Sequence, residues 1–377
     1  MASLKEKVLA ELAQVSSPEG TPLTATGKLS EIVANDGKVF FSITVDAAQV
    51  KQWESVRERA QAAIRALPGV QSVMVALTAE RSGAGAAGTA APRRPQMAPG
   101  GATPAAAARG PAGIPGVAAI IAVASGKGGV GKSTVAVNLA LGLRDLGLKV
   151  GILDADIYGP SLPKLLAISE RPETIGGTKL KPIVRHGMAV MSIGFLVEEE
   201  TPMIWRGPMV MSALTQMLRE VEWGALDVMV VDMPPGTGDA QLTMAQQVPL
   251  KGAVIVSTPQ DLALIDARRG IAMFRRVNVP VLGIVENMST FICPHCGTRS
   301  DIFGHGGARR EAERLNVPFL GEVPLAIEIR ERSDAGAPVV ATEPDGAHAK
   351  IYRDIAARVR EGLQVASRPA PRIIVEA

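Results

Sequence analysis

Short apolar runs recur along the chain from residue 117 onward, and amphipathic segments with a helical period separate them. The runs have the length and composition of buried strands, and the segments between them repeat apolar residues every three or four positions. Strands that alternate with helices in this way predict an α/β fold with a doubly wound, mostly parallel sheet. The expected strands are residues 117–124, 149–153, 185–193, 226–231, 252–257, 281–286 and 319–323, and the expected helices are residues 135–146, 209–221, 261–277 and 343–365.

Residues 1–80 show a separate pattern that predicts a small α/β domain. Alternating apolar positions flank the turn sequence Asn35-Asp36-Gly37, which favours a β-hairpin. Apolar side chains at helical spacing precede and follow this hairpin. The expected helices are residues 4–15 and 50–67, and the expected strands are residues 29–33, 39–45 and 70–77.

Between these two parts, residues 81–115 consist mainly of Ala, Gly and Pro. Such a segment cannot bury enough apolar surface to offset the entropy of ordering it, so we expect a flexible tether. Arg93 and Arg94 are too few charges to favour a basic recruitment motif instead. The chain is therefore expected to contain a small α/β domain (1–80), a linker (81–115), a larger α/β domain (116–366) and a tail (367–377).

Composition and charge indicate the setting in which the chain works. Hydrophobic residues make up 47% of the 377 residues and aromatic residues only 3%, so aliphatic side chains must form the core. The net charge of +3 gives no reason to expect a nucleic-acid partner. No apolar run is long enough to span a membrane, and the N-terminus lacks the apolar core of a signal peptide. We therefore predict a cytoplasmic protein with no membrane partner, and the chain's two cysteines fit that reducing compartment.

A glycine-rich stretch follows the first strand of the larger domain and predicts a phosphate-binding loop. The spacing G-x-x-x-x-G-K-[ST] is met by Gly126, Gly131, Lys132 and Ser133. Glycines allow backbone N–H groups to surround a polyphosphate, and the helix that follows adds its positive end. The lysine of such a loop reaches the β- and γ-phosphates of ATP, and its serine contacts Mg²⁺. The residues expected to contact the nucleotide are Gly126, Lys127, Gly128, Gly129, Val130, Gly131, Lys132, Ser133 and Thr134.

Carboxylates stand at the ends of two further strands. Asp232 follows the apolar run 226–231, a pattern typical of the aspartate that holds Mg²⁺ beside a phosphate-binding loop. Asp154 and Asp156 follow the run 149–153, at the strand end where α/β folds bind ligands. A carboxylate in this position can also cap a helix, but the loop upstream favours a role in the site.

Both cysteines lie in the sequence Cys293-Pro294-His295-Cys296. Four interpretations compete, which we rank as half of an iron–sulfur site, half of a zinc site, a redox pair, and two inert thiols. One chain supplies two thiolates where a four-iron cluster or a tetrahedral zinc usually takes four ligands. His295 and His305 could complete a zinc site within one chain, whereas a symmetric dimer would supply two further cysteines.

Together these motifs resemble the Mrp/ApbC/NBP35 family of iron–sulfur cluster carrier ATPases, which are P-loop NTPases. The resemblance covers K-G-G-V-G-K-S (127–133), D-A-D-I-Y-G-P-S (154–161), D-M-P-P-G-T-G-D (232–239), E-N-M (286–288) and C-P-H-C (293–296). It implies a homodimer that binds and hydrolyses ATP, carries a [4Fe–4S] cluster between its subunits and transfers that cluster to apoproteins.

The resemblance also implies roles for single residues. Lys127 would cross a dimer interface to the partner's nucleotide, and Asp156 would orient the attacking water. Asp154 would lie near the metal, and Asn287 would hold the adenine ring. Asp232 and the residues after it would form a switch segment beside the γ-phosphate.

Residues 1–80 resemble the MIP18-like domain of iron–sulfur assembly proteins. Many such domains carry a cysteine near the start of their second helix, whereas this chain has none there, so a docking or dimer-supporting role is favoured over a metal site. Two other classes share the phosphate-binding loop. One is a positioning ATPase of the MinD or ParA kind, with a structural zinc at the cysteines, and the other is a small-molecule ligase or kinase.

Overall fold

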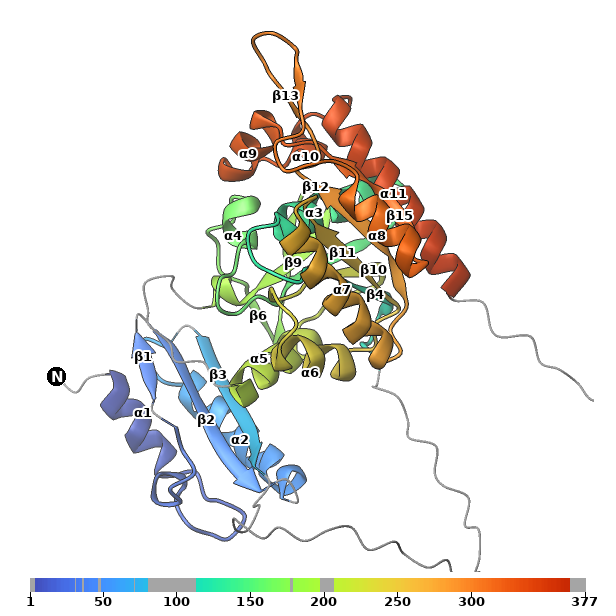
Figure 1. The fold of residues 1–377 in the computed structure, drawn as a ribbon. Coiled ribbons are helices and arrows are strands. Elements are labelled where there is room, and N and C mark those ends of the chain that lie inside the picture. Colours follow the sequence, from blue (N-terminus) through green and yellow to red (C-terminus); the bar gives the residue numbers. More distant parts are fainter. Residues whose placement is uncertain are drawn as a thin grey trace, which may run out of the picture. The chain divides into compact units, whose positions relative to one another are not determined.

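The computed structural model describes residues 4–30, 32–35, 37–46, 49–70, 72–80, 113–176, 179–196 and 207–366. The chain forms two compact units, Met1–Ala112 and Gly113–Ala377 (Figure 1). Most of the expected linker and all of the expected tail lie outside the described residues.

The first unit packs two helices on a small sheet. Within its described residues the strand order is β1-β2-β3, with β1 antiparallel and β3 parallel to β2. The parallel pair is joined through α2, which packs mainly on β3. Phe41 and Trp53 are buried between the layers, and Lys28 Nζ lies 4.4 Å from the Trp53 ring. The elements are α1 (Leu4–Leu12), β1 (Val33–Asn35), β2 (Lys38–Asp46), α2 (Val50–Arg65) and β3 (Ser72–Glu80).

One predicted strand of this unit is wrong. A strand was expected over residues 29–33, but β1 begins only at Val33, and Leu29 makes an isolated bridge with Ile43. Two backbone hydrogen bonds still join this segment to β2, from Ser30 N to Ser42 O and from Thr44 N to Lys28 O. The Ser42 N–H, however, is accepted by the Ser30 hydroxyl at 2.8 Å instead of by a backbone carbonyl, so the pairing is irregular at this edge.

An eight-stranded sheet forms the centre of the described part of the second unit. Its order is β15-β12-β11-β4-β10-β5-β9-β8, and every neighbouring pair is parallel except the pair β8 and β9 at the edge. This arrangement confirms the predicted doubly wound fold. The strands are β4 (Val117–Ala124), β5 (Val150–Asp154), β8 (Ile183–Arg185), β9 (Met188–Ser192), β10 (Leu226–Asp232), β11 (Gly252–Ser257), β12 (Val281–Asn287) and β15 (Phe319–Val323).

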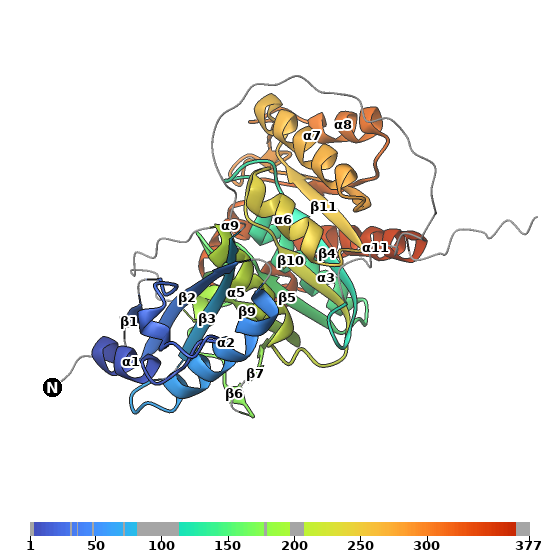
Figure 2. The ribbon, with the colours of Figure 1, turned by 90° about the horizontal axis from the view of Figure 1, so that it is seen from below.

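Helices cover both faces of this sheet (Figures 1 and 2). On one face α3 and α11 pack against each other, with α3 on β5, β10 and β4 and α11 mainly on the edge strand β15. On the other face α7 lies on β11 and α8 on β12. None of the described helices is long and apolar enough to cross a membrane. The helices are α3 (Lys132–Asp145), α4 (Leu162–Leu165), α5 (Gly207–Arg219), α6 (Asp239–Gln247), α7 (Asp261–Arg276), α8 (Gly307–Leu315), α9 (Ile327–Asp334), α10 (Val339–Thr342) and α11 (Ala347–Ala366).

Two predicted elements of the second unit differ from the structure. The run 185–193 is divided because His186 and Gly187 both have positive φ angles (49° and 74°) and form a tight turn between β8 and β9. The helix expected from residue 343 begins at Ala347 instead. Pro344 and Gly346 lie just before that start, and both residues disfavour a helix interior.

Candidate nucleotide and metal sites

The glycine-rich loop connects the end of β4 to the start of α3. Gly129 and Gly131 have φ angles of 80° and 79°, a region that side-chain-bearing residues avoid. A Cβ atom at Gly131 would lie 2.2 Å from Asn287 Nδ2, and one at Gly126 would lie 2.2 Å from the carbonyl carbon of Asp266 in α7. The loop is therefore packed closely against β12 and α7, and glycine is the residue that fits there.

Lys132 and Asp232 form a buried ion pair beneath this loop. Lys132 Nζ lies 2.5 Å from Asp232 Oδ1 and 3.2 Å from Ser133 Oγ. In the sheet, Asp232 pairs with Val123 of β4 on one side and with Asp154 of β5 on the other. Parallel pairing thus brings the carboxylates and the loop to the same edge of the sheet, as the sequence predicted.

The oxygens at this edge fit a hard divalent cation. Asp232 is fully buried, and its Oδ2 has no hydrogen-bond partner within the described residues. Ser133 Oγ accepts a hydrogen bond from the same lysine, Lys132, and lies 3.2 Å from Ser161 Oγ. Mg²⁺ prefers such hydroxyl and carboxylate oxygens, so Ser133 and Asp232 have the donor chemistry of a magnesium site.

Asp154 is fully buried and organises the segment that follows it. Its Oδ2 accepts hydrogen bonds from Ser161 N (2.9 Å), Leu162 N (3.1 Å) and Ser192 Oγ (3.0 Å). Burial, with the nearby charge of Asp232, raises the pKa of Asp154 from 3.8 to about 7. This carboxylate therefore holds the segment 155–162 in place beside the phosphate-binding loop.

Asp156 lies nearby and is 9% exposed. Burial raises its pKa, while the positive charge of Lys132 opposes that change and the negative charge of Asp232 adds to it. Asp156 is thus close enough to the ion pair to sense both partners electrostatically. This position is compatible with the predicted role of orienting a water molecule.

Lys127 is half-buried in the same loop. Its carbonyl accepts a hydrogen bond from Ser125 Oγ at 2.9 Å, and no group of the described residues pairs with its ammonium. Leu262 and Ile265 of α7, the helix that contacts Gly126, are 71% and 37% exposed. Within the described residues, the loop thus carries an unpaired cation, and the helix that contacts it at Gly126 carries two exposed apolar side chains.

Asn287 lies at the end of β12 and is 7% exposed. Its Nδ2 donates a hydrogen bond of 2.8 Å to the carbonyl oxygen of Val130. The side chain predicted to hold adenine is therefore in contact with the phosphate-binding loop itself.

The two cysteines lie in a hairpin that projects from the second unit (Figure 1). We call residues 291–300 the cysteine hairpin; it contains β13 (Phe291–Ile292), β14 (Arg299–Ser300) and the turn between them. Cys293 N donates to Thr298 O and Gly297 N to Cys293 O, which closes the turn. Cys293 is partly buried, Cys296 is exposed, and both are free thiols.

The environment of Cys296 favours a thiolate. Its Sγ lies 3.2 Å from Thr298 Oγ1, and this hydrogen bond, with a smaller contribution from Cys293, lowers the pKa of Cys296 below its usual value. Because the thiolate is the form that binds metals, the hairpin is chemically suited to ligation.

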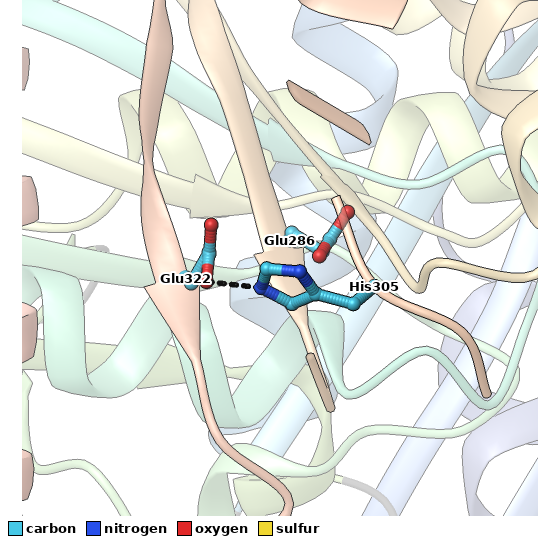
Figure 3. A group of neighbouring side chains, drawn as sticks. All are labelled: Glu286, His305 and Glu322. Atoms are coloured by element: carbon cyan, nitrogen blue, oxygen red, sulfur yellow. Dashed lines mark hydrogen bonds and ion pairs between the residues drawn. The ribbon is translucent and has the colours of Figure 1, made fainter. Parts of the chain in front are cut away.

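A third group of side chains was missed by the sequence analysis. One ligand atom each from Glu286, His305 and Glu322 lie within 4.8 Å of one another (Figure 3). His305 Nε2 is 2.9 Å from Glu322 Oε2, so this histidine, one of the two expected candidates for an intrachain zinc site, is bonded to a carboxylate. Glu286 and Glu322 are register partners in β12 and β15, and such strand pairing is not visible in the sequence.

The fold and the phosphate-binding site define the class of protein. A mostly parallel doubly wound sheet, a glycine loop between β4 and α3 and a buried Lys132–Asp232 pair are the features of a P-loop nucleoside triphosphatase.

Comparison with known families identifies the branch of that class. Residues 116–360 match the model of a family described as NUBPL iron-transfer P-loop NTPase, and residues 5–76 match one described as iron-sulfur cluster assembly protein. The chain belongs to the family of NUBPL iron-transfer P-loop NTPases. This confirms the family expected from the motifs.

Relatives from distant organisms carry similar sequences. The iron-sulfur cluster transfer protein NUBPL of Mus musculus is 56% identical over 236 residues, which are 62% of this chain and 74% of that protein. The iron-sulfur cluster carrier protein of Escherichia coli is 58% identical over 234 residues, 62% of this chain and 63% of that protein. Among solved structures, the nucleotide-binding protein of Archaeoglobus fulgidus in complex with ADP is 39% identical, with a TM-score of 0.54 over 62% of this chain and 91% of that chain.

Proposed function

We propose that this protein is an ATP-hydrolysing iron–sulfur cluster carrier that holds a [4Fe–4S] cluster between the two subunits of a homodimer. One observation carries the proposal: two free cysteines project on a hairpin that leaves the sheet directly after Asn287, the residue in contact with the phosphate-binding loop. A nucleotide site and a pair of thiols are thus built at the same strand end of one chain.

The nucleotide site would work through residues that are already in place. The phosphates would compete with Asp232 for Lys132, while the N–H groups of residues 126–134 surround them. Ser133 and Asp232 would hold Mg²⁺, which supplies charge neutralisation at the transferred phosphoryl group. Asp156 would orient the water for attack, and Asp154 would hold the segment that carries Asp156.

A homodimer would complete both sites. Cys293 and Cys296 are the chain's two cysteines, and a four-iron cluster is usually held by four thiolates. A two-fold axis that passes between the cysteine hairpins of two subunits would place the two cysteines of one subunit opposite the same two cysteines of the other. The same dimer would give Lys127 a phosphate partner and cover the exposed side chains of Leu262 and Ile265.

Partners and organisation follow from this role. The relatives are named as an iron-sulfur cluster transfer protein and an iron-sulfur cluster carrier protein, which supports transfer of a cluster. We propose that the recipients are apoproteins and that scaffold proteins load the cluster. We propose that residues 1–80 form a docking domain, that residues 81–115 tether it to the ATPase domain (116–366) and that residues 367–377 form a tail. We further propose that the protein works in the cytoplasm.

Transfer to a cluster-dependent apoprotein tests this function. Protein purified and reconstituted without oxygen should contain iron and sulfide in equal amounts, and should restore activity to an apoenzyme that needs a [4Fe–4S] cluster. Cys293→Ser and Cys296→Ser should each lose the cluster, while Lys132→Ala should keep it and lose ATP hydrolysis. Stoichiometric zinc in place of iron and sulfide, with no transfer, would favour a positioning ATPase with a structural zinc.

A further inference from the structure

The segment that carries the cysteine hairpin leaves the end of β12 and returns beside it, at the start of α8. Residues 288–305 leave after Asn287, and the next residue, Gly306, donates its N–H to Glu286 Oε1 at 2.9 Å. Ala308 donates its N–H to Glu286 Oε2 at 2.6 Å. One side chain therefore closes the segment that carries both thiols.

Glu286 is fully buried, so its carboxyl oxygens need hydrogen-bond partners inside the protein. The two backbone donors lie at the start of α8, where Gly306 is the N-cap with a φ angle of 71°. A helix N-terminus favours a carboxylate. Because each oxygen of Glu286 has one of these donors, replacing an oxygen by an NH₂ group would release one end of the connection.

Asn287 makes the opposite connection, to the phosphate-binding loop. Its bond to the Val130 carbonyl and its close approach to Gly131 fix its side chain against that backbone. Phosphates bind through the N–H groups of the same loop, so a shift of the loop on binding must move or release Asn287.

The base of the segment is fastened while its tip is not. Met288 has a φ angle of 55°, which is uncommon for a residue with a side chain and marks a sharp change of chain direction. Ser289 N donates to Val323 O at 3.0 Å, and Leu325 N donates to Thr290 O at 2.7 Å. Cys296, at the tip, is exposed. Because these bonds hold the base while the tip is exposed, a displacement of the base would move the thiols with it.

The Glu286–His305–Glu322 group forms part of this anchorage, and no metal ion is needed to satisfy it (Figure 3). Glu322 Oε2 pairs with His305 Nε2 and its Oε1 with Arg309, both at 2.9 Å. Although burial opposes the change, these hydrogen bonds lower the pKa of Glu322, so it is ionised. With the two donors on Glu286, all four carboxylate oxygens have N–H partners.

We infer that Glu286 and Asn287 couple nucleotide occupancy of the phosphate-binding loop to the position of the cysteine hairpin. Asn287 senses the loop at Val130, and Glu286, the adjacent residue, holds the returning chain at Gly306. This inference rests on the proposed nucleotide and cluster sites, and adds the route by which one acts on the other.

Thiol reactivity tests the coupling without a cluster, since Cys293 and Cys296 are the only thiols in the chain. The rate of modification by a thiol reagent is measured on the full-length apoprotein with and without Mg²⁺ and a non-hydrolysable ATP analogue. The protein concentration is chosen so that the oligomeric state, measured by sedimentation, is the same with and without the analogue. We expect the analogue to change the rate by about fivefold or more, the lower end of usual allosteric couplings.

Glu286→Gln should abolish the effect of the analogue on the modification rate. The affinity of this variant for the analogue, measured by calorimetry, should stay close to that of the unmodified protein. Asn287→Ser should also abolish it, and serves as the second test if Glu286→Gln does not fold. Glu313→Gln, an exposed change on α8, should leave it intact.

Three results would overturn the inference: equal rates with and without bound analogue, an undiminished effect in Glu286→Gln, or stoichiometric zinc binding by the Cys293→Ser, Cys296→Ser variant. Absence of analogue binding by the unmodified protein would instead refute the proposed function.

Discussion

At the scale of single residues, the structure shows that Asp154, Asp156 and Asp232 have different hydrogen-bond partners, a difference that the sequence does not show. Asp232 is paired with Lys132. Asp154 accepts hydrogen bonds from backbone N–H groups, that of Asp156 included, and from the Ser192 hydroxyl. The Asp156 carboxylate lies close enough to Lys132 and Asp232 for both charges to act on its pKa. The three carboxylates therefore have different expected effects when they are neutralised.

Asp156→Asn should bind ATP with nearly unchanged affinity but hydrolyse it about 100-fold more slowly, since a water-orienting carboxylate contributes in the transition state. Steady-state phosphate release and equilibrium binding of a non-hydrolysable analogue would measure the two effects. Lys132→Ala is the comparison, because it should lose binding itself. Normal hydrolysis by Asp156→Asn would assign that carboxylate a capping role only.

Asp154 should make the unfolding free energy depend on pH. Its pKa is about 7 when folded and 3.8 as an isolated group, so the folded chain binds the extra proton between these values. The stability it contributes is thus fully present below about pH 4 and is lost as the pH rises to about 7, on the order of a few kcal/mol in all. In urea denaturation at several pH values, Asp154→Asn should lack this loss.

The control for that series is Asp354→Asn, which removes an exposed carboxylate from α11. It should follow the pH dependence of the unmodified protein. If Asp154→Asn also follows it, Asp154 is already ionised in the folded chain below neutral pH.

At the scale of elements, apolar patterning was enough to predict the larger domain, but it could not predict short exposed elements or contacts that depend on strand register. The runs 252–257 and 319–323 coincide with β11 and β15. β11 is buried along its whole length and almost entirely apolar, as is typical of a strand inside a parallel sheet. The cysteine hairpin and β8 were missed, since such short exposed elements carry no apolar period. The Glu286–His305–Glu322 group was missed because strand register brings it together.

Gly131→Ala tests the contact between the phosphate-binding loop and β12. Its φ of 79° and the 2.2 Å approach to Asn287 Nδ2 should destabilise the second unit by roughly 1–3 kcal/mol, measured by urea denaturation. Adding Asn287→Ala should recover part of the loss by removing the clash. Gly128→Ala, where a Cβ meets nothing within 4 Å, should be near neutral. Equal losses at both glycines would show that the contact with Asn287 is unimportant.

At the scale of the whole molecule, the two compact units predict that the ATPase part folds alone. The boundary lies at Gly113, and Ile114, 7% exposed, packs just before β4. Residues 113–377 should therefore keep ATP binding, dimer formation and the cluster. Calorimetry with nucleotide, sedimentation and iron analysis on this fragment would test the expectation. An insoluble or nucleotide-free fragment would mean that the first unit completes the core.

The central claim is that one cluster is shared by two chains, and native mass spectrometry of the anaerobically reconstituted protein tests it most directly. The account predicts a dimer that carries the mass of one [4Fe–4S] cluster, and a Cys293→Ser, Cys296→Ser variant that carries none. A cluster or zinc ion bound stoichiometrically to a single chain, or a double variant that retains iron and sulfide, would contradict it.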